Sequence, residues 1–140
     1  MGIVLKSGLV RAEELDKMQK PIVYCAPGAA ARELAVPLNV PLAEKLAAVR
    51  PNRRSMRMER CVGEVLNGLP ENSVIRDFDV LFHPDYQVDV LKILIAACKR
   101  KSFGIIWPGR YADGRLRYAE EGCSDYKTFD ISDYDITCVV

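Results

Sequence analysis

The segment YCAPGAAARELAVPLNV, Tyr24–Val40, decides how the rest of the chain is interpreted. It overlaps an apolar run, IVYCA at residues 22–26, whose β-branched residues are typical of a buried strand. The turn APG follows, and AAARELA is typical of a short helix. A strand, a glycine-containing turn and a helix, in that order, form the setting in which proteins build a phosphate-binding loop.

The turn keeps few of the residues that such a loop needs. The motif GxxxxGK[ST] uses glycines to bring backbone N–H groups to the phosphates, a lysine to reach them, and a hydroxyl to bind magnesium. When this motif is overlaid on APGAAARE, residues 26–33, Ala31 takes the place of its last glycine. Arg32 takes the place of its lysine, and Glu33 takes the place of its Ser or Thr. The stretch alone is more typical of a tight strand-to-helix turn. The candidate nucleotide-binding residues are Pro27, Gly28, Arg32 and Glu33.

A second stretch, VIRDFD at residues 74–79, resembles a Walker B strand, in which an acid at the strand end holds magnesium. Asp77 is the candidate magnesium ligand, and Asp79 is the candidate for positioning a water molecule. Both are therefore candidate catalytic residues. The pattern is short and common, and acids that merely end a strand would produce it too. Because parallel strands end at one edge of a sheet, we expect these acids and the turn after IVYC to share that edge.

Strand and helix patterns alternate along the rest of the chain. Helical patterns occupy residues 11–20, 41–49, 53–69 and 88–101, and strand patterns occupy residues 36–40, 72–82, 103–107 and 136–140. The pair Asp113-Gly114 is a hairpin-turn signal. We therefore predict one α/β domain over residues 1–140, with a mostly parallel sheet, right-handed crossovers and a C-terminal β-hairpin extension.

Basic residues gather at two helix ends. A solvated face is the ordinary interpretation of the cluster that opens the 53–69 helix, and the alternatives are contact with nucleic acid or with an acidic partner. Its members are Arg53, Arg54, Arg57 and Arg60. Lys99, Arg100 and Lys101 stand where cations suit the dipole of the preceding helix. The alternative role for Arg100 is an arginine finger that acts across an interface.

The composition is that of an ordinary globular domain. The chain has 140 residues, 49% of them hydrophobic, and a formal net charge of +1, so no overall field draws it to nucleic acid or membrane. No apolar run approaches the roughly 20 residues that span a bilayer, and the N-terminus lacks the apolar region of a signal peptide. Five dispersed cysteines and a single histidine argue for reduced thiols and against zinc. We expect a cytoplasmic protein without membrane association.

The order of these segments resembles the BrxF family, the small P-loop proteins of type 3 BREX phage-defence systems. The most specific part of the resemblance is a strand that ends in Trp107, followed by Gly109, GRLRYAE and the pair Asp125-Tyr126. The stretch DVLFHPDYQVDVLKIL, residues 79–94, is similar to that family's Walker B strand and following helix. The resemblance runs from about Pro21 to the C-terminus.

This resemblance implies a P-loop-NTPase-like, three-layer domain with ATP and Mg²⁺ as cofactors. It also implies other BREX proteins as partners in bacterial antiviral defence. The chain departs from the family at the loop, because the GK[ST] residues are missing and Ala29–Ala35 provides only about two helical turns at 3.6 residues each. Asp77 matches the acid of the family's Walker B strand more directly than any residue of the loop matches the family's P-loop.

Three hypotheses remain open at the level of the sequence. The first is a non-catalytic, or at most weakly nucleotide-binding, accessory subunit with a degraded nucleotide-binding loop that acts through protein partners, with DNA as a further candidate contact. The second is an ATP-hydrolysing enzyme that is active only within an assembled complex or oligomer. The third is a DNA-binding module that uses the arginine-rich helix.

Overall fold

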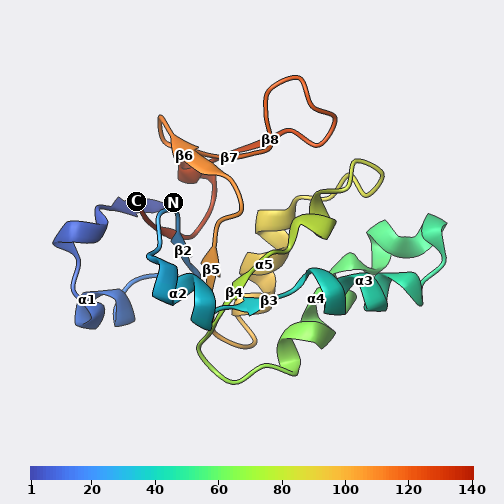
Figure 1. The fold of residues 1–140 in the computed structure, drawn as a ribbon, viewed down its shortest axis with the longest axis horizontal. Coiled ribbons are helices and arrows are strands. Elements are labelled where there is room, and N and C mark those ends of the chain that lie inside the picture. Colours follow the sequence, from blue (N-terminus) through green and yellow to red (C-terminus); the bar gives the residue numbers. More distant parts are fainter.

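A six-stranded parallel sheet organises the chain in the computed structural model, which describes residues 1–140 (Figure 1). The strands lie in the order β1-β9-β2-β5-β4-β3, and all neighbouring pairs are parallel. Their bounds are β1 Ile3–Leu5, β2 Ile22–Tyr24, β3 Val36–Pro37, β4 Ser73–Arg76, β5 Phe103–Ile106 and β9 Thr137–Val139. The predicted α/β class with a mostly parallel sheet is confirmed.

Short helices connect these strands, and none of them is long and apolar enough to cross a membrane. The α-helices are α1 Ala12–Asp16, α2 Ala29–Leu34, α3 Asn39–Ala47, α4 Arg54–Asn67 and α5 Val90–Cys98. Single 3₁₀ turns are η1 Ser7–Leu9, η2 Pro51–Arg53, η3 Asp79–Phe82 and η4 Ile131–Asp133. Helix α4 packs against both α3 and α5, so these three helices form one layer.

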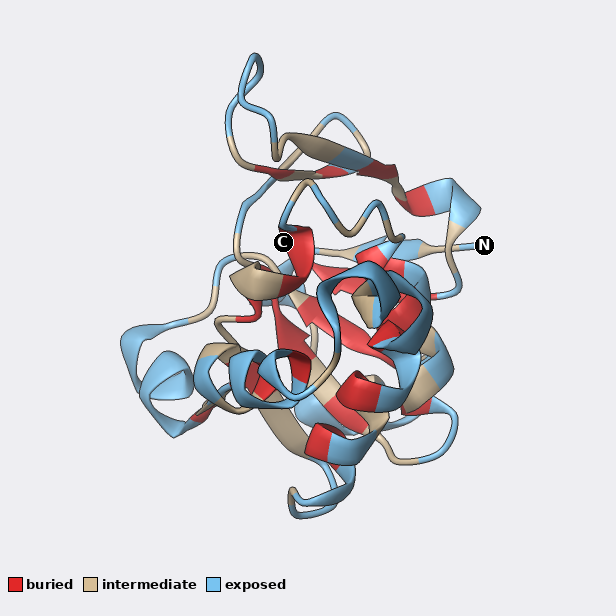
Figure 2. Ribbon diagram, turned by 90° about the vertical axis from the view of Figure 1, so that its right-hand side faces the viewer, coloured by how far each residue is buried: buried red, intermediate tan, exposed pale blue.

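The main core lies between the sheet and this helical layer. Ile75, Ile105, Val23 and Cys138 form a row across four neighbouring strands, and all four are fully buried. The predicted apolar stripe of α4 faces the same core, while the other sides of the helices face solvent (Figure 2). Its buried residues are Met58, Cys61, Val62, Val65 and Leu66. Each such side chain contributes about 1.5–3 kcal/mol on burial, which makes this face the main source of stability.

The opposite face of the sheet carries a shallow groove of about 290 Å³. Gly104 lies there between Tyr24 and Val74, and a Cβ at Gly104 would come within 3.2 Å of Tyr24 Cε2 and 3.3 Å of Val74 Cγ2. Leu15 of the short helix α1 borders the groove. The sheet is therefore packed much more heavily on its α3–α5 side.

A second, antiparallel sheet of three strands follows β5 and corresponds to the predicted C-terminal hairpin extension. Its strands are β6 Arg110–Ala112, β7 Arg115–Tyr118 and β8 Lys127–Asp130, in the order β6-β7-β8. Asp113 and Gly114 join β6 to β7 with φ angles of 52° and 76°. Two consecutive residues with positive φ are typical of a two-residue hairpin turn, which confirms the prediction from Asp113-Gly114.

The small sheet is anchored to the end of the parallel sheet by close contacts. Trp107, directly after β5, donates a hydrogen bond from Nε1 to the carbonyl of Arg117 at 2.9 Å. The rings of Phe82 and Tyr118 stack with centroids 3.8 Å apart. A Cβ at Gly109 would lie 1.8 Å from the Arg117 carbonyl oxygen, so only glycine fits between the two segments.

Several local predictions need correction. The strand predicted for residues 72–82 ends at Arg76, because Asp77 adopts a positive φ of 51° and η3 follows. The strand predicted for residues 36–40 ends at Pro37. Helix α3 begins at Asn39, two residues before the start predicted at Pro41. Strand β1 was not predicted, and it pairs with the predicted C-terminal strand at the edge of the sheet.

Candidate functional site at the carboxyl edge of the sheet

The loop after β2 and the acids after β4 both lie at the carboxyl edge of the parallel sheet, as the sequence predicts. Strand β5 separates these two strands, so Gly28 and Asp77 follow strands that are not neighbours. The end of β5, at Trp107, lies between them. An open α/β sheet binds ligands at this edge, which makes it the first place to look for a site.

Asp77 forms its contacts with residues of its own chain. Its carboxylate forms an ion pair with the guanidinium of Arg76, and its carbonyl accepts a hydrogen bond from the backbone N–H of Leu38 at 3.2 Å. The Nε of Arg76 also donates to the carbonyl of Ala35 at 3.3 Å. These bonds hold the acid against the start of α3. They also place a positive guanidinium beside the carboxylate that a magnesium ion would need.

Asp79 is engaged through both of its carboxylate oxygens. Tyr118 donates its hydroxyl proton to Oδ2 at 3.0 Å, and Asn39 Nδ2 donates to Oδ1 at 3.4 Å. Asn39 Oδ1 in turn accepts the backbone N–H of Val80 at 2.9 Å. Burial raises the pKa of the Tyr118 phenol, and the hydrogen bond to Asp79 raises it further. Asp79 therefore joins α3, η3 and the small sheet.

The predicted loop has the expected order of strand, turn and helix, but its backbone lacks the features of a phosphate-binding loop. Gly28 precedes α2 with φ −70° and ψ 166°, an extended conformation that any residue can adopt. A Cβ at Gly28 would meet open space, so no close approach requires glycine there. None of the six residues of α2 is buried, and Arg32 and Glu33 are both exposed without side-chain hydrogen bonds or ion pairs.

A pair of thiols lies beside the loop that no sequence pattern indicated. Cys25 directly follows β2, and its backbone N–H donates to the carbonyl of Val139 in β9 at 2.9 Å. The Cys138 thiol donates a hydrogen bond that lowers the pKa of Cys25, while this contact and burial raise the pKa of Cys138. All five cysteines are free thiols, as predicted. Only the position of β9 beside β2 reveals this pair.

The four arginines predicted for nucleic acid or partners do not act as one surface. Arg54 Nε donates to the carbonyl of Val49 at 3.0 Å and so ties α4 to the end of α3. Arg60 Nε pairs with Glu64 at 3.2 Å, and Lys45 pairs with the other oxygen of Glu64 at 3.2 Å. Both contacts, that with Lys45 first, lower the pKa of Glu64. Arg53 and Arg57 are exposed and their side chains form no hydrogen bond or ion pair within the chain, so two of the four are free.

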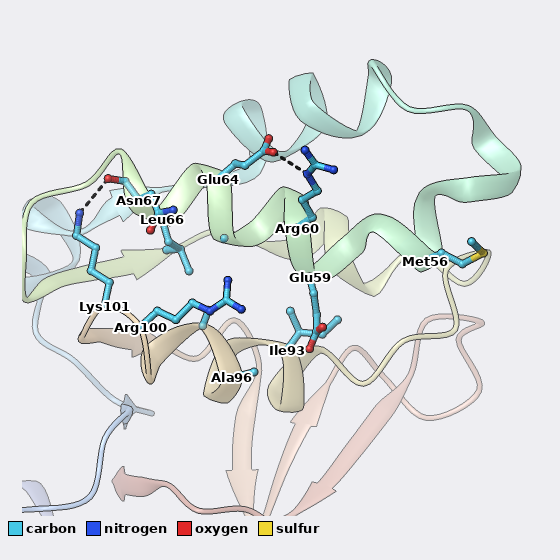
Figure 3. A pocket seen from close by; sticks show the side chains of 12 residues that line it. Met56, Glu59, Arg60, Glu64, Leu66, Asn67, Ile93, Ala96, Arg100 and Lys101 are labelled. Atoms are coloured by element: carbon cyan, nitrogen blue, oxygen red, sulfur yellow. Dashed lines mark hydrogen bonds and ion pairs between the residues drawn. The ribbon is translucent and has the colours of Figure 1, made fainter.

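Arg100 lies at the other end of the molecule from the loop. It precedes the start of β5, whereas Gly28 and Asp77 follow the ends of strands parallel to β5. Its side chain lies in a groove between α4 and α5 (Figure 3). The predicted arginine finger would therefore act on another chain and not on the loop of its own.

No family model, curated protein or solved structure matches this chain. The structure also brings together no group of three or more His, Cys, Asp or Glu side chains that could hold a metal ion.

Proposed function

We propose that this chain is a non-catalytic accessory subunit of a bacterial BREX-type anti-phage defence system, and that it acts by contacting other proteins of that system. The proposal rests on the resemblance of residues 21–140 to the BrxF family together with the state of the loop. Its scaffold is a P-loop-like domain whose nucleotide-binding loop is degraded.

The strand arrangement supports a P-loop-like scaffold. A short parallel strand leads through Gly28 into a helix, and a second strand ends at Asp77 on the same edge of the sheet. P-loop proteins use these two positions to bind the phosphates and the magnesium ion. The small antiparallel sheet, with Trp107 and Gly109 at its base, contains the segment that most resembles the family.

The observation that carries the non-catalytic assignment is the ion pair between Arg76 and Asp77. Mg²⁺ takes hard oxygen ligands, above all carboxylates and phosphates. In this arrangement a guanidinium stands beside the Asp77 carboxylate, on a backbone held at positive φ, and would repel a magnesium ion that approached it. Asp79, with both oxygens accepting hydrogen bonds, offers no ready substitute.

The loop fits phosphates equally poorly. Phosphate binding at a helix N-terminus depends on several backbone donors and a cation that converge on one point. Arg32 is exposed, and α2 has no buried residue that would hold its N-terminus in place. Glu33 adds a negative charge where phosphate oxygens would approach. The residues present therefore do not fit magnesium and a nucleoside triphosphate, and we derive no hydrolytic step.

Exposed apolar residues support a role in protein contacts. Leu34 is 86% exposed, Met56 82% and Val40 69%. They lie on three different helices, α2, α4 and α3. Single exposed apolar residues are common, yet here they accompany a loop whose catalytic residues are missing.

Calorimetric titration with magnesium-ATP, together with a turnover assay, tests the proposal. We expect no binding up to millimolar nucleotide and no turnover for the wild-type chain. Asp77→Asn should leave both results unchanged, as should the exposed control Asp85→Asn. The proposal is wrong if ATP turns over at an ordinary enzymatic rate and Asp77→Asn abolishes that turnover while Asp85→Asn does not.

A further inference from the structure

The groove between α4 and α5 has a volume of about 480 Å³. Its floor consists of small and apolar residues from the two helices: Gly63, Leu66, Ile93, Ala96 and Ala97. A Cβ at Gly63 would meet nothing within 4 Å, so the floor is open where a side chain could stand. The part of α4 between Glu59 and Asn67 spans about 12 Å at 1.5 Å per residue, which is roughly two helical turns.

Charges of opposite sign stand at the two ends of this groove. Arg100 extends between the helices at one end, beside Lys101, whose Nζ donates to the carbonyl of Asn67 at 3.0 Å (Figure 3). Glu59 points from α4 toward Ile93 at the other end (Figure 3). Arg60 also borders the groove, but its side chain turns to Glu64. Arg100 and Glu59 have no partner in the chain and are free to pair with another molecule.

We propose that this groove binds a helix of a partner protein that presents small apolar side chains between a carboxylate and an amine. The carboxylate pairs with Arg100, the amine pairs with Glu59, and the apolar side chains fill the space above Gly63 and Ala97. An amphipathic helix lying in a groove is a common mode of peptide recognition. The proposal deepens, and rests on, the proposed function of contacting other proteins.

The chemistry of the groove favours a protein helix over other occupants. A nucleic acid would bring only phosphates to the rim, which suit Arg100 but would leave Glu59 facing a like charge. Its bases would find an aliphatic floor in place of the aromatic platforms on which single strands stack. A second copy of this chain is a less suitable occupant, because its exposed helix α2 carries Arg32 and Glu33 side by side and not about two turns apart.

The test uses a labelled synthetic helical peptide in which Leu and Ala residues separate one Glu from one Lys by about two turns. Its fluorescence anisotropy is followed on titration with the full chain. We expect Arg100→Glu to weaken binding about fivefold or more, because an attractive pair becomes a repulsive one. Lys92→Glu is the matched control, since it makes the same charge change on the nearby helix α5 but outside the groove, and it should leave binding unchanged. Arg100→Lys should keep most of the affinity.

A second variant tests the shape of the groove and not its charge. Gly63→Leu fills the open floor and removes a glycine from a helix interior, so it should fold at least as well as the wild type. We expect it to abolish peptide binding. In two-dimensional NMR spectra, the peptide should shift the amide signals of Gly63 and Ala97 and leave those of the carboxyl edge unmoved.

Several results would overturn the proposal. They are the absence of amide shifts in the groove at millimolar peptide, equal affinity for a peptide whose Glu is replaced by Lys, and equal loss of binding in Arg100→Glu and Lys92→Glu. Duplex DNA shifting the same amides, or concentration-dependent shifts from self-association, would assign the groove to another occupant. Because the groove shares no lining residue with the loop, Asp77 or Asp79, the ATP titration can fail or succeed independently of this test.

Discussion

The hydroxyl of Tyr118 donates a hydrogen bond of 3.0 Å to Oδ2 of Asp79, and this bond ties the small antiparallel sheet to the end of β4. It joins η3, which follows β4, to strand β7 of the small sheet. The acid that sequence reasoning assigned to water positioning is thus held in a structural contact between the two sheets.

Removing that hydroxyl should destabilise the protein. Tyr118→Phe leaves the half-buried Asp79 carboxylate without a partner on one oxygen, and we expect the free energy of unfolding to fall by about 1–3 kcal/mol. Urea unfolding followed by tryptophan fluorescence measures this, since Trp107 lies in the same aromatic cluster. Tyr86→Phe, whose hydroxyl makes no hydrogen bond in the chain, is the control. Equal stability of both variants would show that the bond contributes nothing.

Alkaline pH should weaken the fold through two tyrosines. Burial, and then hydrogen bonds to Asp79 and Asp89, raise the pKa values of Tyr118 and Tyr134 above the ordinary value. A raised pKa in the folded state means that the stabilisation is complete below pH about 10 and is lost as pH rises beyond it.

The measurement is the free energy of unfolding as a function of pH, for the wild type and for the double variant Tyr118→Phe, Tyr134→Phe. We expect the wild type to lose stability with a steeper slope above pH about 10 than the double variant. Identical slopes would mean that the two phenols titrate normally in the folded protein.

Replacing Gly109 or Gly63 with alanine should change the free energy of unfolding in opposite directions. At Gly109 a Cβ would lie 1.8 Å from the Arg117 carbonyl oxygen, so Gly109→Ala must separate β7 from the end of β5. We expect a loss of about 3 kcal/mol or more, a size typical of overpacking at backbone. Gly63→Ala, in an open helical position, should gain about 0.5–1 kcal/mol. Thermal unfolding by circular dichroism compares them, and a stable Gly109→Ala would contradict the close approach.

The arginine-rich helix should bind duplex DNA weakly. Arg54 and Arg60 are held within the chain, only Arg53 and Arg57 are free, and the net charge is +1. Affinity that rests on few phosphate contacts is low at physiological salt. Anisotropy titrations at two salt concentrations measure it. Tight binding with a steep salt dependence, reduced by Arg53→Ala and Arg57→Ala, would restore the DNA-binding hypothesis.

The sequence predicted the local elements where the signal itself is local. The period of the apolar residues on α4 and the β-branched run of β2 depend on neighbours within one segment, and the hairpin at Asp113-Gly114 depends on the φ angles of two residues. The strand predicted past Arg76 was too long because DFDVLF is apolar enough for a strand. The positive φ of Asp77 and the turn of η3 depend on contacts with α3 and the small sheet.

By itself, the sequence determined that this is an α/β protein with a strand and turn over residues 22–28, acids after a second strand, and a hairpin near the end. Only the tertiary structure decided that Asp77 pairs with Arg76, that Asp79 binds Tyr118, that Cys25 meets Cys138, and that Arg100 stands in a groove away from the loop. The physical reason is that segment patterns follow from the local backbone and burial. Contacts between distant segments follow from the order of the strands, which the periodicity of the side chains does not encode.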